Sequence, residues 1–236
     1  MISKFFIKGT TFTWNAPQPI SPANMDGTIV QSGQNPGPAM TYSGLDNEIT
    51  YGKMRGPLAS VYASTSPPQS HGLNANQPVP NIWLNYVLGR TAYMQTAGGD
   101  VLTGFMSGCW ITTWTEGGNR YVGHVGTVES SPKDQPPNST VKNTFAAKFA
   151  GNPSAGTNLK GFNPASAWSL SQIRSVCKES TTSWGSYMGN SKIMALVTRN
   201  NHFYSILMIK NGNDWICGGS KRVHSKDQAA VLRALA

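Results

Sequence analysis

Glycine and proline interrupt this chain so often that long helices have little room to form. The 236 residues include 25 glycines and 15 prolines, and only 12% of the residues are charged. Short runs rich in aromatic and β-branched side chains lie between these interruptions, and such runs favour strands. Seven tryptophans and eight tyrosines need a core or a cleft to cover them, so disorder is excluded. The sequence therefore predicts a loop-rich β protein.

The order of the expected elements indicates an α+β fold. Strands are predicted at 5–14, 101–105, 109–115, 121–128, 192–199, 202–210 and 214–217, and the run 82–90 fits either a strand or a short helix. Helices are predicted at 141–150, capped by Ser139 or Thr140, after Asn163-Pro164, and from a capping box at 225–228 to Leu235. Because strands come first, then helices and again strands, we expect a mainly antiparallel β-sandwich core with peripheral helices and long loops. The length fits a single domain over residues 1–236.

The positive charge is concentrated in the second half of the chain. Residues 1–130 contain six basic and six acidic residues, whereas residues 131–236 contain thirteen basic residues against four acidic ones. The whole net charge of +9 therefore belongs to the second half. A basic surface of this kind favours an acidic partner. No RNA-binding or DNA-binding motif is present, so no nucleic acid partner is expected.

The three cysteines are Cys109, Cys177 and Cys217, and their odd number and wide spacing do not fit a disulfide framework. Cys177 lies in a predicted amphipathic helix and Cys217 in a predicted core strand, so both are expected to be buried apolar residues. Because the chain has neither a C-x-x-C pair nor an H-E-x-x-H motif, we expect no metal site and no cofactor.

Cys109 and His124 are the most informative pair. Each lies in a predicted strand, and residues 115–120 between them have the composition of a hairpin turn. Pairing these strands would bring a thiol beside an imidazole, which is the minimum arrangement for a cysteine nucleophile with a histidine base. A lone cysteine or histidine in a strand is more often structural, so this pair is a hypothesis that geometry has to support.

A cysteine nucleophile also needs an orienting group for its base and donors for the oxyanion. Thr103 can orient the His124 ring through its hydroxyl or its backbone carbonyl. Ser107 and Gly108 leave the approach to the sulfur uncrowded, and nearby backbone N–H groups can line an oxyanion pocket. Trp110 and Trp114 can form the walls of a cleft.

The pattern of these residues resembles the Cys–His glutamine deamidases, which include the catalytic domains of the cytotoxic necrotizing factors, the Burkholderia lethal factor and the CheD deamidases. Met106-Ser107-Gly108-Cys109 is similar to the L-S-G-C motif of the lethal factor, and the interval of fifteen residues from Cys109 to His124 is similar to that of the necrotizing factors. Thr103 matches the third catalytic position of the lethal factor and CheD patterns. In the necrotizing factors the third group comes from farther upstream, so its identity stays open. The resemblance covers residues 103–127.

This resemblance implies a secreted bacterial toxin or effector that converts a glutamine of a host protein to glutamate through a Cys109 thioester. An amine in place of water would give transglutamination. By resemblance, the target is a Rho-type small GTPase or a translation-initiation helicase, selected by the loops at 15–40, 64–80 and 129–138. We expect a monomer without a membrane span.

The beginning of the chain is too short and too soon interrupted by charge to be a Sec-type signal peptide. The expected route is therefore synthesis in the bacterial cytoplasm and delivery to the host cytosol by a dedicated machine. Two alternatives stay open. One is another cysteine amidase or a papain-like protease, and the other is a non-enzymatic, aromatic-rich binding module of the lectin or adhesin type.

Overall fold

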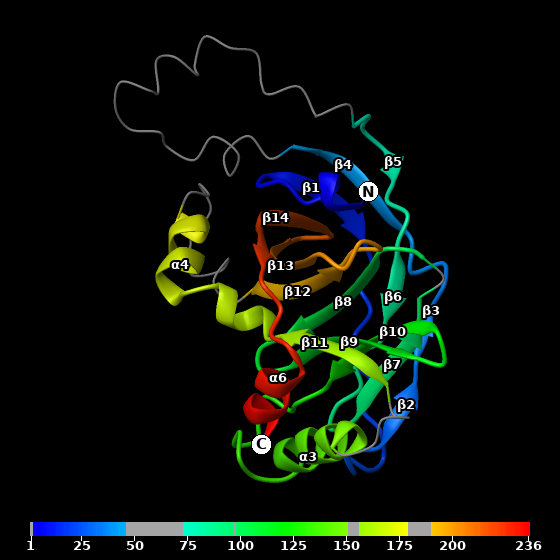
Figure 1. Cartoon of the computed structure of the whole chain (residues 1–236). Helices are drawn as coiled ribbons and strands as arrows, with labels where there is room; N and C mark the ends of the chain where they lie inside the picture. The colour runs from blue at the N-terminus through cyan, green and yellow to red at the C-terminus, as the bar shows by residue number, and fades with distance from the viewer. Residues whose placement is uncertain (1, 46–72, 97, 151–155, 179–189) are drawn as a thin grey trace.

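The computed structural model describes residues 2–45, 73–96, 98–150, 156–178 and 190–236. Within these residues the chain is mainly β, with two mixed sheets and three α-helices. One sheet has nine strands and curls around its own core, and the second has five strands and packs beside it (Figure 1). No helix among the described residues is long and apolar enough to span a membrane.

The larger sheet brings together strands from both ends of the chain. Its order is β3 (Gly33–Gln34), β6 (Ile82–Leu84), β8 (Val101–Met106), β12 (Ser191–Val197), β13 (Phe203–Asn211), β14 (Asp214–Val223), β1 (Thr10–Trp14), β4 (Met40–Leu45) and β5 (Gln77–Pro78). Register shifts interrupt the β1–β4, β8–β12 and β13–β14 pairings. Such irregularities bend strands and increase their twist, which explains why this sheet curls.

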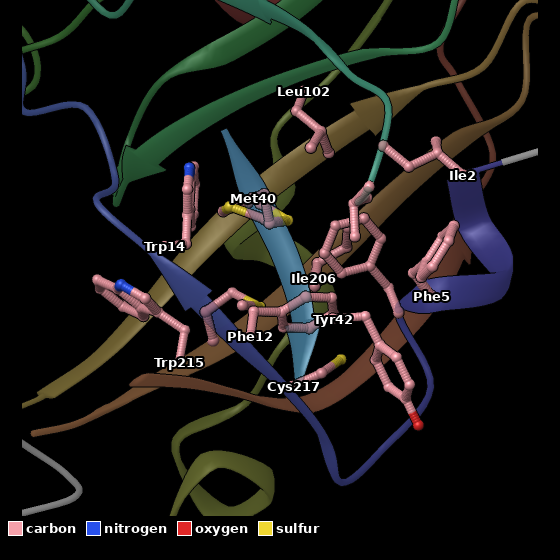
Figure 2. Packing of buried hydrophobic residues seen from close by; sticks show 14 of the residues in the cluster. Ile2, Phe5, Phe12, Trp14, Met40, Tyr42, Leu102, Ile206, Trp215 and Cys217 are labelled. Carbon is pink, nitrogen blue, oxygen red and sulfur yellow. The ribbon is translucent and has the colours of Figure 1, made fainter. Parts of the chain in front are cut away.

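The concave side of the curl holds an aromatic core. Trp14 packs edge-on against Trp83 and Phe105, and Phe105 stacks on Trp215 at 4.5 Å between ring centroids. Figure 2 shows this cluster, in which the short 3-10 helix Ile2–Phe5 places two further apolar side chains. Burial of this many large side chains fixes the curl of the sheet.

The smaller sheet has the order β11 (Thr157–Phe162), β9 (Trp110–Glu116), β10 (Asn119–Val125), β7 (Thr91–Gln95) and β2 (Ile29–Gln31). Its outer face is covered by α3 (Asn138–Phe149) and α6 (Gln228–Leu235), which pack against Trp110, Trp114 and Val125. Its inner face meets the larger sheet. The third helix, α4 (Leu170–Lys178), follows the 3-10 helix η3 (Pro164–Ala167) and packs on the larger sheet.

A separate apolar cluster fills the space between the two sheets. The smaller sheet contributes Ile111 and Val122, and the larger sheet contributes Val101, Ala195 and Val197. All five side chains are fully buried. This inter-sheet layer also contains Cys109, so the fold places the expected nucleophile in a packed seam.

Several predicted elements are confirmed. The strands expected at 101–105, 109–115 and 121–128 are β8, β9 and β10, and the hairpin around Asn201 joins β12 to β13. Asn163 caps the helical turn that follows it, because its side chain accepts from the N–H groups of Ala165 and Ser166.

Other expectations need correction. The expected sandwich is a curled nine-stranded sheet with a five-stranded partner, and two strand pairs, β6–β8 and β2–β7, are parallel. Residues 5–9 are not part of the first strand, which begins at Thr10. Helix α3 begins at Asn138 without a side-chain cap, so neither Ser139 nor Thr140 caps it, and Asp227 instead of Ser225 caps α6.

Candidate active site

Cys109 and His124 lie on the inner face of the β9–β10 hairpin. His124 in β10 is directly opposite Ile111 in β9, and Cys109 immediately precedes β9, two residues before Ile111. Residues opposite each other or two apart share a face, so both side chains point into the seam between the sheets. There Cys109 is 1% exposed and His124 is fully buried.

His124 is held from the opposite sheet. The Thr103 hydroxyl of β8 lies 2.6 Å from His124 Nδ1, and both groups are fully buried. Burial lowers the pKa of His124 to about 3, so the imidazole is neutral near pH 7. Its other nitrogen, Nε2, is buried and has no hydrogen-bond partner among the described residues. The ring is therefore fixed through Nδ1, whereas Nε2 forms no hydrogen bond with the Cys109 thiol in this state.

Tyr86 forms one wall of this arrangement. Its ring stacks on the His124 ring, with 4.6 Å between centroids and 8° between planes. Its hydroxyl donates to the Thr127 carbonyl, the same oxygen that lies 3.8 Å from the Cys109 sulfur. The same side chain thus contacts the candidate base and shares an acceptor with the candidate nucleophile.

The Cys109 thiol has a second polar neighbour in Thr127. The sulfur lies 3.8 Å from the Thr127 carbonyl oxygen and 3.6 Å from its hydroxyl oxygen. Burial raises the pKa of the thiol, and hydrogen bonds from Thr127, Tyr86 and the Gly108 backbone act in the opposite direction. The enclosed thiol is therefore protonated at rest, with donors already placed around it for a thiolate.

Two surface hollows flank the buried thiol. A polar hollow of about 350 Å³ is lined by Thr127, Trp110 and the loop before Cys109. A more apolar hollow of about 480 Å³ is lined by Tyr86 and by Trp168 beside α4. Ser107 and Glu129 line both hollows. Thr127, which neighbours the sulfur, lines the polar hollow, and Tyr86 lines the more apolar one.

The predicted accessory residues have different positions. Ser107 is exposed, and Ser107, Gly108 and Trp110 line the polar hollow. The expectation of an uncrowded approach to the sulfur is wrong, because the thiol is almost completely covered. Trp114 does not wall the cleft, since it packs on the outer face of the sheet under α3.

Tyr86 and Thr127 were not singled out in the sequence. Thr127 ends the strand-rich run that contains His124, so its proximity to the site has a local signal. Tyr86 has none, because it lies in an apolar run 23 residues before Cys109 and reaches the site only through the packing of β6 and β7 around β10.

The other two cysteines lie away from the seam. Cys217 is buried in the aromatic core of the larger sheet, where burial raises its pKa to about 12, and Cys177 belongs to α4 and is buried against the same sheet. Both expectations of burial are confirmed. In the part of the chain that the structure describes, no three His, Cys, Asp or Glu side chains are grouped to hold a metal ion. The loop expected at 64–80 lies partly outside the described residues.

Comparisons with known proteins add a weak structural likeness. No protein-family model matches the chain, and no curated protein sequence matches it significantly. The chain is weakly similar to the crystal structure of the C-terminal domain of CNFy from Yersinia pseudotuberculosis, at 11% identity and a TM-score of 0.25. The match covers 65% of this chain, which in turn spans 65% of the length of that one. At this TM-score the likeness carries no weight for function, so the case for a function rests on the residues of the site.

Proposed function

We propose that this chain is a cysteine-dependent amidohydrolase that deamidates a glutamine side chain of a target protein. The observation that carries the proposal is the buried set of Cys109, His124 and Thr103. In it the imidazole is fixed through Nδ1 by a hydroxyl from the opposite sheet, while Nε2 has no partner among the described residues. A nucleophile, a base and an orienting group are the parts that acyl transfer requires.

In the first half of the reaction, His124 takes the proton of the Cys109 thiol and the thiolate attacks the carboxamide carbon. A C–S bond forms, and the carbonyl oxygen becomes an oxyanion that backbone N–H groups beside Gly108 stabilise. The His124 imidazolium then protonates the amide nitrogen, the C–N bond breaks, and ammonia leaves. The product of this half is a thioester on Cys109.

In the second half, neutral His124 takes a proton from water, and the resulting hydroxide attacks the thioester carbon. The C–S bond breaks, the thiolate recovers a proton, and glutamate is released. A primary amine in place of water gives a substituted amide by the same steps, which is transglutamination.

The resting site is held in a neutral state. Burial raises the pKa of Cys109 and lowers that of His124, so a thiolate–imidazolium pair is disfavoured before substrate binds. The nearly complete cover over the thiol requires movement of the Tyr86 or Thr127 wall to admit a side chain. We therefore infer that the target protein opens and activates the site when it docks.

The surroundings of the site favour an acidic target. Lys133 and Lys142 line the polar hollow. Trp110 also lines this hollow, and the ammonium of Lys226 lies 5.4 Å from the centre of its ring. These lysines belong to the basic half of the chain. We propose that they steer an acidic surface of a host protein, such as a small GTPase or a helicase, towards the hollow.

Two competing functions have less support. A papain-like enzyme places its cysteine at a helix N-terminus, whereas Cys109 precedes a strand. An aromatic binding module needs exposed rings, yet five of the six described tryptophans are buried and the sixth, Trp168, is half-buried. Trp184 lies outside the described residues.

The decisive experiment is quantitative mass spectrometry of a eukaryotic cell lysate incubated with the wild-type protein or with Cys109→Ser. The proposal expects a glutamine converted to glutamate by the wild type alone. Cys217→Ala is the matched control, because it removes a thiol from the separate core and should retain conversion. Equal conversion by Cys109→Ser would exclude Cys109 as the nucleophile. New peptide termini without deamidation would instead identify a protease.

A further inference from the structure

We propose that Tyr86 is a further catalytic residue of this site, whose hydroxyl donates a hydrogen bond to the Cys109 thiolate while its ring holds His124 in place. The inference rests on the proposed function, because it assigns a role within the same site. Tyr86 belongs to neither strand of the β9–β10 hairpin and follows β6 in the chain.

The position of the ring is tightly determined. It stacks on His124 at 4.6 Å with nearly parallel planes and is 7% exposed, between the imidazole and the more apolar hollow. The backbone around it is anchored on β10, because Gly89 donates to the Gly126 carbonyl at 2.8 Å and Gly126 donates to the Arg90 carbonyl at 3.0 Å. The backbone next to Tyr86 is therefore fixed to the end of β10.

The Tyr86 hydroxyl has one hydrogen, and it shares its acceptor, the Thr127 carbonyl, with the Cys109 thiol, whose sulfur lies 3.8 Å from that oxygen. At rest it donates to the Thr127 carbonyl, and the protonated thiol needs no donor from it. When the thiol loses its proton, the negative sulfur becomes the stronger acceptor. Rotation about the C–O bond then turns the hydrogen from the carbonyl oxygen to the sulfur, without any movement of the ring.

The thiolate needs such a donor because His124, the group that would carry the compensating positive charge, is difficult to protonate. Buried His124 resists protonation, so an imidazolium cannot stabilise the thiolate for long. The hydroxyl of Thr127 lies 3.6 Å from the sulfur, the Tyr86 hydroxyl and the thiol share the Thr127 carbonyl, and burial together with the negative charge of Glu129 raises the pKa of Tyr86. Of these two hydroxyls, that of Tyr86 belongs to the side chain that also stacks on His124.

The test is a titration of the thiol that does not depend on its accessibility. The protein is labelled with cysteine carrying ¹³C at Cβ, and the Cys109 signal is identified by its absence in Cys109→Ser. The pH at the midpoint of its titration is compared in the wild type, in Tyr86→Phe and in Tyr42→Phe. Tyr42 is the matched control, since it is a buried tyrosine in the separate aromatic core.

We expect the Cys109 midpoint to rise by about one pH unit in Tyr86→Phe, which keeps the ring and loses the donor, and to stay unchanged in Tyr42→Phe. An unchanged or lower midpoint in folded Tyr86→Phe would overturn the proposal. If Tyr86→Phe does not fold, 4-aminophenylalanine at position 86 keeps the ring and a weaker N–H donor that stays neutral through the titration. The midpoint should then rise, and an unchanged midpoint overturns the proposal.

The outcome separates this role from the proposed function. A shifted midpoint without any deamidation in lysate would retain Tyr86 as the thiolate donor and discard glutamine as the substrate. Deamidation by the wild type with no shift in Tyr86→Phe would retain the deamidase and remove Tyr86 from its chemistry.

Discussion

His124 has one fixed nitrogen, and the residue that fixes it comes from a different sheet. Replacing Thr103 by Val keeps the volume but leaves Nδ1 without a partner, so the ring can rotate or change tautomer. We expect kcat on the target glutamine to fall by roughly 10- to 100-fold, because small displacements of a catalytic group are costly. Thr103→Ser keeps the hydroxyl and should stay close to wild type. Full activity in a folded Thr103→Val would show that the contact is only structural.

For single residues of the candidate site, the sequence could predict a shared position only where the residues lie close together in the chain. Cys109, His124 and Thr103 lie within 22 residues, and the hairpin and the neighbouring strand limit where their side chains can go. Tyr86 could not be predicted, because its contact with His124 depends on how a separate connection packs across β10. A tyrosine in an apolar run is ordinarily a core residue, and no local pattern distinguishes this one.

Among the elements, the connection between β6 and β7 packs against a single glycine at the end of β10. A Cβ atom on Gly126 would lie 2.2 Å from the Val87 carbonyl and 3.2 Å from the Tyr86 ring. Gly126→Ala must therefore push this backbone away. We expect a loss of about 1–3 kcal/mol of unfolding free energy and a change in the Cys109 titration, measured by denaturant melts and by NMR. Unaltered stability would mean that the connection is loosely packed.

The start of α3 is organised by Asn138 and not by a hydroxyl cap. The Asn138 side chain accepts from the Val128 N–H at 2.6 Å and donates to the carbonyls of Val128, Ser131 and Pro132. It thereby fixes the loop at 128–132, which borders the polar hollow. Asn138→Ala should lower the free energy of unfolding by about 2–3 kcal/mol, because the loop loses the hydrogen bonds of this buried side chain. Ser139→Ala should cost little, and a larger loss there would restore the predicted cap.

The length and regularity of a run decide whether its strand could be predicted from the sequence. Long alternating runs such as 192–199 and 202–210 have a clear period and a tight turn, and they form β12 and β13. The strands β4, β7 and β11 were missed because their runs are short and interrupted by glycine and polar residues. Pairing with a neighbour defines these strands, and pairing leaves little trace in a short sequence window. The curl of the larger sheet could not be predicted either, because it depends on register shifts between paired strands.

For the molecule as a whole, the buried neutral His124 makes the free energy of unfolding decrease at acidic pH. The pKa of His124 is about 3 in the folded state and near 6.5 when unfolded, so the unfolded chain binds more protons between these values. This contribution to stability is complete above pH 6.5 and is lost as the pH falls towards 3, by at most about 1.4 kcal/mol for each pH unit. Denaturant melts of wild type and His124→Gln from pH 7 to pH 4 measure it. The variant should show the flatter profile, and parallel profiles would contradict burial of a neutral ring.

The position of the site between two sheets has a consequence for how activity is acquired. One sheet supplies Thr103, the other supplies His124, and neither sheet alone contains the assembled group. On the proposed function, a chain that has formed only one sheet is therefore inactive, and its His124 gains the Thr103 partner only when the two sheets dock. Activity should vanish in the same transition as near-ultraviolet circular dichroism, even where strand signal persists. If the proposed function holds, activity reports that both sheets are formed and docked, and any process that separates the sheets abolishes it.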